Sequence, residues 1–295
     1  PRVIIPFLLT GSIWGSTWLV ITGQIGDVPA AWSVFYRFAL ATPALFFVAV
    51  LMKRRLKLTG PEHRLAALVG VLQFSGNFLF VYHAELYMTS GVVALMFGLM
   101  MVPNALLARA FLGERAHGGF LVGSAIAIVG VSLLLAHEWQ ANPGSGVVGG
   151  NVGLGIALTL LGMLAASLAN VVQANELGRG VPMVSLLAWA MVYGTGFDLG
   201  FALFTAGPPP LPTAPQFWMG TLYLALIGSV ITFPLHYNLV REIGAGRTAY
   251  NGILTISVAM ALSTLFEDYR WTALTAGGMG LAVLGMVLAL RSKSR

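Results

Sequence analysis

Amide side chains inside long apolar stretches are the first residues of this sequence that could do chemistry. Gln73 and Asn77 are four residues apart, so on a helix they share one face. Their donors and acceptors suit the carboxylate and the ammonium group of an amino acid. A hydrogen bond between two neighbouring helices is the alternative use of these groups. Further candidates for the lining of a cavity are Asn170, Gln173, Tyr250 and Asn251.

Two histidines, each beside a tyrosine, fall near the ends of apolar stretches. Tyr82 precedes His83, and His236 precedes Tyr237. These side chains could form a gate or the rim of a cavity, and the histidines could relay protons because histidine titrates near neutral pH. The alternative is a histidine at the membrane interface that only water contacts. All four residues are candidates for substrate binding.

Aromatic residues also pair at helical spacing, Trp14 with Trp18 and Trp189 with Tyr193. Each pair would share one face of a helix. A cavity lined by such rings would stack against an aromatic or bulky apolar side chain, which is worth about 0.5–1.5 kcal/mol per good pair beyond burial. Packing against lipid or against another helix is the alternative for each ring.

Arg37 and Asp198 are the only charged residues well inside apolar stretches. An isolated charge in a membrane is costly, so each should have a partner. The two could pair with each other, or Arg37 could bind backbone carbonyls. The sequence has no cysteine, no His-Glu-x-x-His and no Gly-x-x-x-x-Gly-Lys-Ser/Thr. We therefore expect no catalytic residue, no bound metal and no cofactor.

The elements that must position these side chains are membrane helices. Charged residues make up only 9% of the 295 residues, against about 25% in soluble domains. About ten apolar stretches of roughly 20 residues follow one another, and each can cross a bilayer core of about 30 Å. The sequence thus predicts an all-α membrane protein. The ten expected transmembrane helices are Val3–Ile21, Ala31–Met52, Leu65–Tyr87, Ser90–Phe111, Phe120–Ala136, Gly153–Leu177, Pro182–Ala206, Gln216–Val240, Thr248–Phe266 and Trp271–Leu290.

The distribution of basic residues predicts the orientation of these helices. With the N-terminus in the cytoplasm, every lysine and arginine falls on the cytoplasmic side except Arg37, within a span, and Arg270. Both termini are then cytoplasmic. The first stretch lacks a convincing small-residue cleavage site, so we expect a retained helix and not a signal peptide. Four tryptophans fall at the outer interface and are expected to anchor the protein there, namely Trp32, Trp139, Trp218 and Trp271.

The ten helices divide into two halves of five. Because five is odd, the second half must be inverted relative to the first. A short pattern supports the division, since Phe80-x-x-His83-x-x-Leu86 recurs as Phe233-x-x-His236-x-x-Leu239. We expect residues 1–141 and 153–295 to form the two repeats, with residues 142–152 as a Gly-rich linker. Inverted halves typically rock about a central site, which gives alternating access.

Several motifs resemble those of the drug/metabolite transporter superfamily, in its ten-helix EamA-type branch. Ile13-Trp14-Gly15-Ser16-Thr17 resembles the opening signature of this branch. Further matches are Tyr36-Arg37-Phe38, Pro103, Phe111-Leu112-Gly113-Glu114 and Gly123 to Gly130-Val131. The resemblance covers the whole chain and implies a transporter built of two inverted five-helix repeats. The second half reads Phe266-Glu267-Asp268, without the glycine, so no role is carried to it.

The resemblance and the polar and aromatic residues together favour an exporter of aromatic or other apolar amino acids in the bacterial cytoplasmic (inner) membrane. We expect a monomer or weak dimer that contacts lipid and no nucleic acid. A sugar phosphate or nucleotide sugar is disfavoured as substrate, because phosphate prefers arginine or lysine, no lysine lies in any span and only Arg37 is available well inside one. A multidrug exporter would depend on Asp198 as its only intramembrane carboxylate. An intramembrane lipid enzyme is less favoured still. Transport could run down the substrate gradient or be coupled to protons through a histidine.

Overall fold

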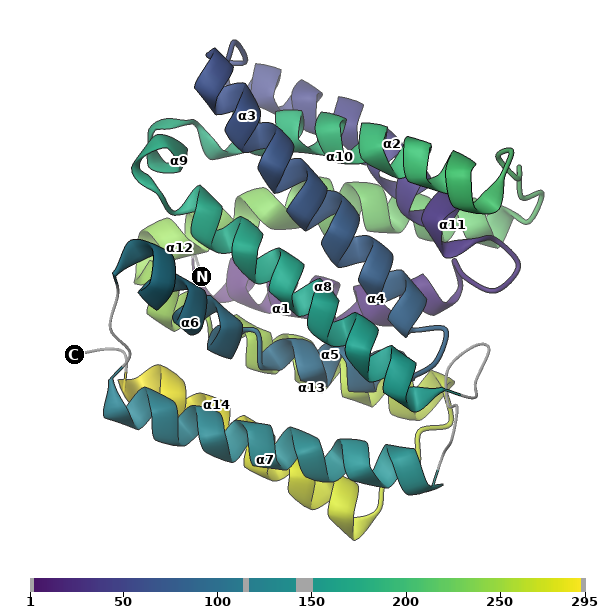
Figure 1. Ribbon diagram of the computed structural model, residues 1–295, viewed down its shortest axis with the longest axis vertical. Helices are drawn as coiled ribbons and strands as arrows, with labels where there is room; N and C mark the ends of the chain where they lie inside the picture. Colours follow the sequence, from purple (N-terminus) through teal and green to yellow (C-terminus); the bar gives the residue numbers. More distant parts are fainter. Residues whose placement is uncertain (1–2, 114–116, 142–150, 293–295) are drawn as a thin grey trace.

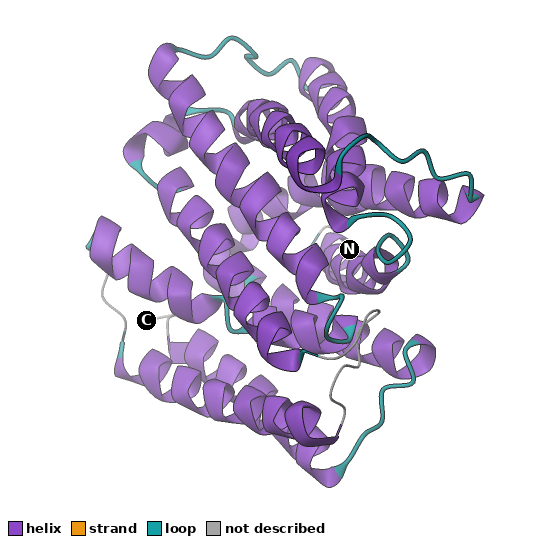
Figure 2. Ribbon diagram, turned by 45° about the vertical axis from the view of Figure 1, so that its right-hand side comes forward, coloured by secondary structure: helices purple, strands orange, loops and turns teal. Residues whose placement is uncertain are grey.

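In the computed structural model, the described residues are 3–113, 117–141 and 151–292. This part of the chain is all helical and contains no strand, as the sequence predicts (Figure 2). In chain order the elements are α1 (Ile4–Thr22), α2 (Ala30–Leu51), α3 (Gly60–Val69), η1 (Gly70–Asn77), α4 (Phe78–Ala84), α5 (Ser90–Gly98), α6 (Met101–Leu112), α7 (Gly118–Ala141), α8 (Val152–Gln173), α9 (Glu176–Gly180), α10 (Met183–Ala206), α11 (Pro215–Leu222), η2 (Tyr223–Ile231), α12 (Thr232–Thr248), α13 (Asn251–Phe266) and α14 (Ala273–Ser292).

Nine helical stretches within the described residues are long and apolar enough to cross a membrane, and α13 is a shorter apolar helix. The chain is therefore a multi-pass membrane protein. Some boundaries differ from those expected. The fourth expected helix is interrupted between α5 and α6. The sixth ends at Gln173, because Asn175 Oδ1 accepts a hydrogen bond from Gly178 N–H at 2.7 Å and starts the separate α9. The eighth continues to Thr248 as α12.

The third and eighth spans each contain a π-helical segment, η1 and η2. Such segments are rare and frequently occur at functional sites. Here, η1 contains the two amides Gln73 and Asn77, and η2 contains Ser229. The first residues of η1 and η2 are separated by the same number of residues as Phe80 and Phe233. The π-helical segments therefore occupy equivalent positions in the two halves of the sequence.

At one edge of the bundle, α7 and α14 lie side by side (Figures 1 and 2). Gly123 lies against Gly285, and Gly130 lies against Gly278, so the two helices run antiparallel. An added Cβ on Gly123 would lie 2.3 Å from the backbone nitrogen of Ala289. Only glycine permits this approach, which is a common device where membrane helices pack closely.

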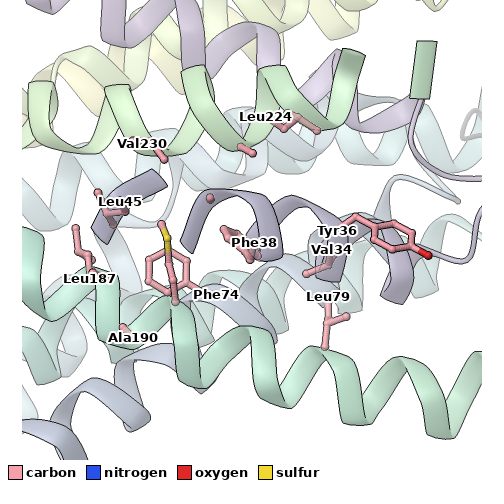
Figure 3. Close-up of a cluster of buried hydrophobic side chains, with 14 of the residues drawn as sticks. Val34, Tyr36, Phe38, Leu45, Phe74, Leu79, Leu187, Ala190, Leu224 and Val230 are labelled. Carbon is pink, nitrogen blue, oxygen red and sulfur yellow. The ribbon is translucent and has the colours of Figure 1, made fainter. Parts of the chain in front are cut away.

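The largest cluster of buried apolar side chains joins α2, η1, α10 and η2 (Figure 3). The rings of Phe38 and Phe74 meet edge to face with their centroids 5.2 Å apart. Leu45 and Leu187 are fully buried in the same cluster. Because lipid is itself apolar, close packing and not water exclusion stabilises such a cluster inside a bilayer. This packing holds η1, and with it the amide pair, in place.

Glu267 connects the end of α13 to the start of α5. Its carboxylate accepts hydrogen bonds from Ser90 N–H at 3.1 Å and from Ser90 Oγ at 2.5 Å. An acidic group at this position satisfies an N–H at the start of a helix and complements the helix dipole. The contact fixes α5, which contributes to the cavity described below.

Replacing Glu267 by alanine is expected to lower the free energy of unfolding by about 1 kcal/mol, the usual contribution of a helix cap. The midpoint of thermal unfolding in detergent measures the change. Asp27, an exposed acid in the loop between α1 and α2, provides the control Asp27→Ala. Equal midpoints for the two variants would show that the Glu267 contact does not stabilise the fold.

Candidate functional site

A cavity of about 560 Å³ lies in the described part of the helix bundle. Its volume is within the range of pockets that hold small molecules, about 300–1,000 Å³. Its walls come from both halves of the chain, including α1, η1, α5 and α6 in the first half and α8, α12, α13 and α14 in the second. The interruption between α5 and α6 lies at this cavity, where Gly98, Met100 and Met101 line it. Most of the lining is apolar, with a small number of polar groups.

Aromatic rings form part of the wall. Trp14 donates a hydrogen bond from Nε1 to the carbonyl of Gly228 in η2 at 3.2 Å. Its ring centroid is 4.8 Å from that of His236 and 5.6 Å from that of Phe233. Trp18 lies one helical turn further along α1 and packs against Phe97 at 5.1 Å. The rings therefore have fixed positions, and they offer flat surfaces to an apolar or aromatic ligand.

Three amide oxygens at the cavity accept no hydrogen bond within the described residues, namely those of Asn77, Gln173 and Asn251. The amide nitrogens of two of these side chains are engaged. Gln173 Nε2 donates to the Ala169 carbonyl at 3.2 Å, and Asn251 Nδ2 donates to the Phe7 carbonyl at 2.6 Å. A buried acceptor without a partner is costly, by about 1–3 kcal/mol. The arrangement therefore favours a ligand that donates hydrogen bonds, as an ammonium group does.

Eight of the fourteen candidate residues line this cavity, and they come from five separate helical elements. They are Trp14, Trp18, Gln73, Asn77, Asn170, Gln173, His236 and Asn251. The structure thus brings together residues far apart in the sequence. Their roles in binding remain predictions.

Among the described residues, five other candidates do not line the cavity. Tyr82 is fully buried in α4, with its hydroxyl 3.4 Å from Arg37 Nη1. The Nδ1 of His83 is 2.6 Å from the Leu79 carbonyl one turn earlier. Tyr250 precedes α13 and is half-buried.

Trp189 and Tyr193 on α10 form a separate cluster with His63 of α3. Tyr193 Oη is 3.0 Å from His63 Nδ1, and Trp189 Nε1 donates to the Leu56 carbonyl at 2.8 Å. These contacts engage the polar groups of both side chains away from the cavity. The last candidate, Tyr237, belongs to α12, and its side chain lies outside the described residues.

Five polar residues that line the cavity were not among the candidates from the sequence, namely Thr17, Arg37, Asn104, Thr248 and Thr255. Asn104 Oδ1 accepts a hydrogen bond from Asn170 Nδ2 at 3.4 Å. It is a polar residue inside an apolar stretch, so the signal that identified Gln73 and Asn77 would have found it too.

Arg37 and Asp198 do not form the ion pair considered above. Arg37 donates from Nη1 to Tyr82 Oη and from Nη2 to Ser229 Oγ at 3.2 Å. Asp198 is fully buried on α10, where Ser75 of η1 is its neighbour. The two side chains do not pair, because Arg37 is bonded to Tyr82 and Ser229 whereas Asp198 lies next to Ser75. Only Arg37 of the two lines the cavity.

The sequence matches the model of the EamA-like transporter family twice, over residues 2–136 and 153–291. Protein PagO of Salmonella typhimurium is 22% identical over 98% of this chain and 91% of that protein. An Escherichia coli protein named "Probable amino-acid metabolite efflux pump" is 25% identical over 95% of this chain and 92% of that protein. A crystal structure of another protein superposes with a TM-score of 0.70 at 16% identity, covering 99% of this chain and 98% of the other, which shows a common fold.

These relatives are named for transport or efflux, or carry no activity in their names, and none of those described above is named as an enzyme. The two matches to one family model together cover most of the chain. The chain belongs to the EamA-like transporter family and is a membrane transporter, not an enzyme.

Proposed function

We propose that this transporter exports amino acids, with aromatic or other apolar side chains, across the bacterial cytoplasmic membrane. The observation that carries the proposal is the composition of the cavity, in which aromatic rings and methionines surround amide oxygens that lack partners. The apolar wall suits the side chain of such a substrate, and the amides suit its ammonium group. The name of the Escherichia coli relative, an amino-acid metabolite efflux pump, supports the same class of substrate.

We propose alternating access between two inverted repeats, residues 1–141 and 153–295, as the mechanism. The two separate matches to the family model support this division. The equivalent positions of η1 and η2 and the antiparallel packing of α7 on α14 support it as well. On this proposal the cavity is the central site about which the halves rock, and both termini are cytoplasmic.

Within the family, we propose that the chain is most similar in function to the bacterial aromatic amino acid exporter YddG, acting as a monomer or weak dimer. Transport of a phosphorylated substrate is less favoured, because Arg37 is the only lysine or arginine among the described residues that line the cavity.

Uptake into proteoliposomes tests the proposed function. The purified protein is reconstituted, and the entry of radiolabelled tryptophan, phenylalanine, threonine and a sugar phosphate is followed with and without a pH gradient. We expect tryptophan and phenylalanine to enter faster than the other two, and faster than into protein-free liposomes. Indifference to the pH gradient would indicate facilitated diffusion. Sugar phosphate uptake without amino acid uptake would refute the proposed substrate.

Gln73→Ala is expected to lower tryptophan uptake by about 3- to 10-fold, the effect of losing one hydrogen bond of about 1 kcal/mol. His83→Ala, on the same span, is expected to have a smaller effect, because its Nδ1 contacts the Leu79 carbonyl and its side chain does not line the cavity. Initial rates at equal amounts of folded protein measure both effects. Unchanged uptake in both variants would exclude the third span from the substrate site.

A further inference from the structure

Arg37 places a permanent positive charge at the wall of the cavity. The residue lies on α2, is only 3% exposed and is among those that line the cavity. Its guanidinium group lies over the ring of Phe78 at 4.4 Å, a cation–π contact. Because arginine stays protonated in proteins, this charge persists in every step of a transport cycle.

The direct partners of this guanidinium group are uncharged. It donates hydrogen bonds to Tyr82 Oη at 3.4 Å and to Ser229 Oγ at 3.2 Å, and its Nε has no partner within the described residues. A guanidinium group has five N–H donors, so part of its capacity is unused. Among the described residues, Glu85 is an acid that interacts electrostatically with Arg37, but it forms no ion pair with it.

A buried cation without an ion-pair partner is costly, and an anion that reaches it recovers part of that cost. Arg37 is among the residues that line the cavity, so an anion in the cavity can approach it. Its Nη2 lies near Gly228, where an added Cβ would lie 3.8 Å from Arg37 Nη2 and 2.9 Å from Thr17 Cγ2. The carbonyl of the same glycine accepts a hydrogen bond from the indole Nε1 of Trp14. A cationic group and a fixed aromatic wall thus meet at one short segment of η2.

We propose that Arg37 binds the carboxylate of the transported molecule and so restricts transport to substrates that carry one. The inference rests on the proposed function and deepens it, because it assigns the acidic end of the amino acid to one residue. Asn77, which precedes Phe78 in the sequence and has an oxygen without a partner, is then in position to accept from the ammonium group. Hydrogen bonds to charged groups are among the strong ones, because both partners are ionised.

A series of indole compounds tests this assignment in the reconstituted wild-type protein. Tryptophan carries both charges, tryptophanamide and tryptamine lack the carboxylate, and indole-3-propionate lacks the ammonium group. Each unlabelled compound competes against the uptake of radiolabelled tryptophan. We expect tryptophanamide and tryptamine to compete roughly 10- to 100-fold more weakly than tryptophan, the effect of losing one hydrogen-bonded charge.

The same competition series in two Arg37 variants tests whether this residue causes the preference for a carboxylate. In Arg37→Gln the advantage of tryptophan over tryptophanamide should fall to within about 3-fold, and Arg37→Lys should retain part of it because lysine keeps the charge but not the fork of donors. Arg179→Gln, at an exposed arginine that donates to the Ala174 carbonyl on the surface, is the matched control and should behave as wild type.

The possible outcomes separate the inference from the proposed function. Tryptophan uptake with equal competition by tryptophanamide would overturn the role of Arg37 and leave the amino acid exporter standing. Preserved selectivity in Arg37→Gln would do the same. Should that variant fail to fold, the competition series in the wild type decides. Absence of any amino acid uptake by the wild type would overturn both.

Discussion

Replacing Ala166 by phenylalanine is expected to reduce tryptophan uptake by about 100-fold. Ala166 lies on α8, is 3% exposed and lines the cavity. A phenyl ring at this position would extend into the space between the two halves, where the substrate is proposed to bind. Overpacking a well-packed site costs up to about 3 kcal/mol. A loss of this size in binding free energy corresponds to a decrease in uptake of about 100-fold. Initial uptake rates in proteoliposomes at equal protein content measure it.

Ala157 provides a matched control on the same helix. Its side chain is exposed on the outside of the bundle, so Ala157→Phe adds the same ring without entering the cavity. Both variants should migrate as folded protein in size-exclusion chromatography. If Ala157→Phe lowers uptake as much as Ala166→Phe does, the effect comes from the added ring in general, and the cavity is not the transport path.

The second large effect is expected at the contact between η1 and α10. A Cβ on Gly194 would lie 2.8 Å from the Gly70 carbonyl oxygen and 2.9 Å from Phe74 Cβ. Gly194→Ala should therefore push η1 away from α10 and lower the free energy of unfolding by about 1–3 kcal/mol, the usual cost of overpacking. Because η1 contains Gln73 and Asn77, we expect Gly194→Ala to lower tryptophan uptake as well as stability.

Gly196→Ala is the control for this prediction. Gly196 lies on the same helix, and a Cβ there meets nothing within 4 Å. The change should leave unfolding unaltered or raise its midpoint slightly, because alanine favours a helix by up to about 1 kcal/mol over glycine. Thermal unfolding in detergent compares the two variants. A lower midpoint for Gly196→Ala than for Gly194→Ala would contradict the proposed contact.

The sequence predicted the helical membrane architecture well because apolar length is a direct consequence of bilayer thickness. Local interruptions were not predictable in this way. The π-helical segments and the break between α5 and α6 leave no mark in a pattern of apolar residues. Trp32 was expected in the outer aromatic belt, but it is 1% exposed and packs against Phe35 and Tyr36 on α2, so it is not an interfacial anchor.

Only some of the candidate residues line the cavity, and helix geometry explains why the others do not. Asn77, at the end of η1, and Phe78 and Val81, on α4, line the cavity; Val81 is four residues after Asn77 and lies on the same helical face. Tyr82 and His83 lie further around the helix and point elsewhere. Tyr82 and His83 were chosen as candidates because they are polar, although they lie on a different face of the helix from Asn77. For Trp189 and Tyr193 the sequence could not reveal the competing partner, His63, which lies more than a hundred residues earlier.

Photolabelling would test most directly whether the cavity is the amino acid site. A radiolabelled phenylalanine analogue with a photoreactive diazirine is added to the reconstituted protein, irradiated and mapped to peptides. We predict adducts on segments that line the cavity, such as those with Trp14, Asn77 and Phe97, and their suppression by excess unlabelled tryptophan. Adducts confined to exposed surface residues such as Phe204, 91% exposed, and unchanged by tryptophan, would contradict the assignment.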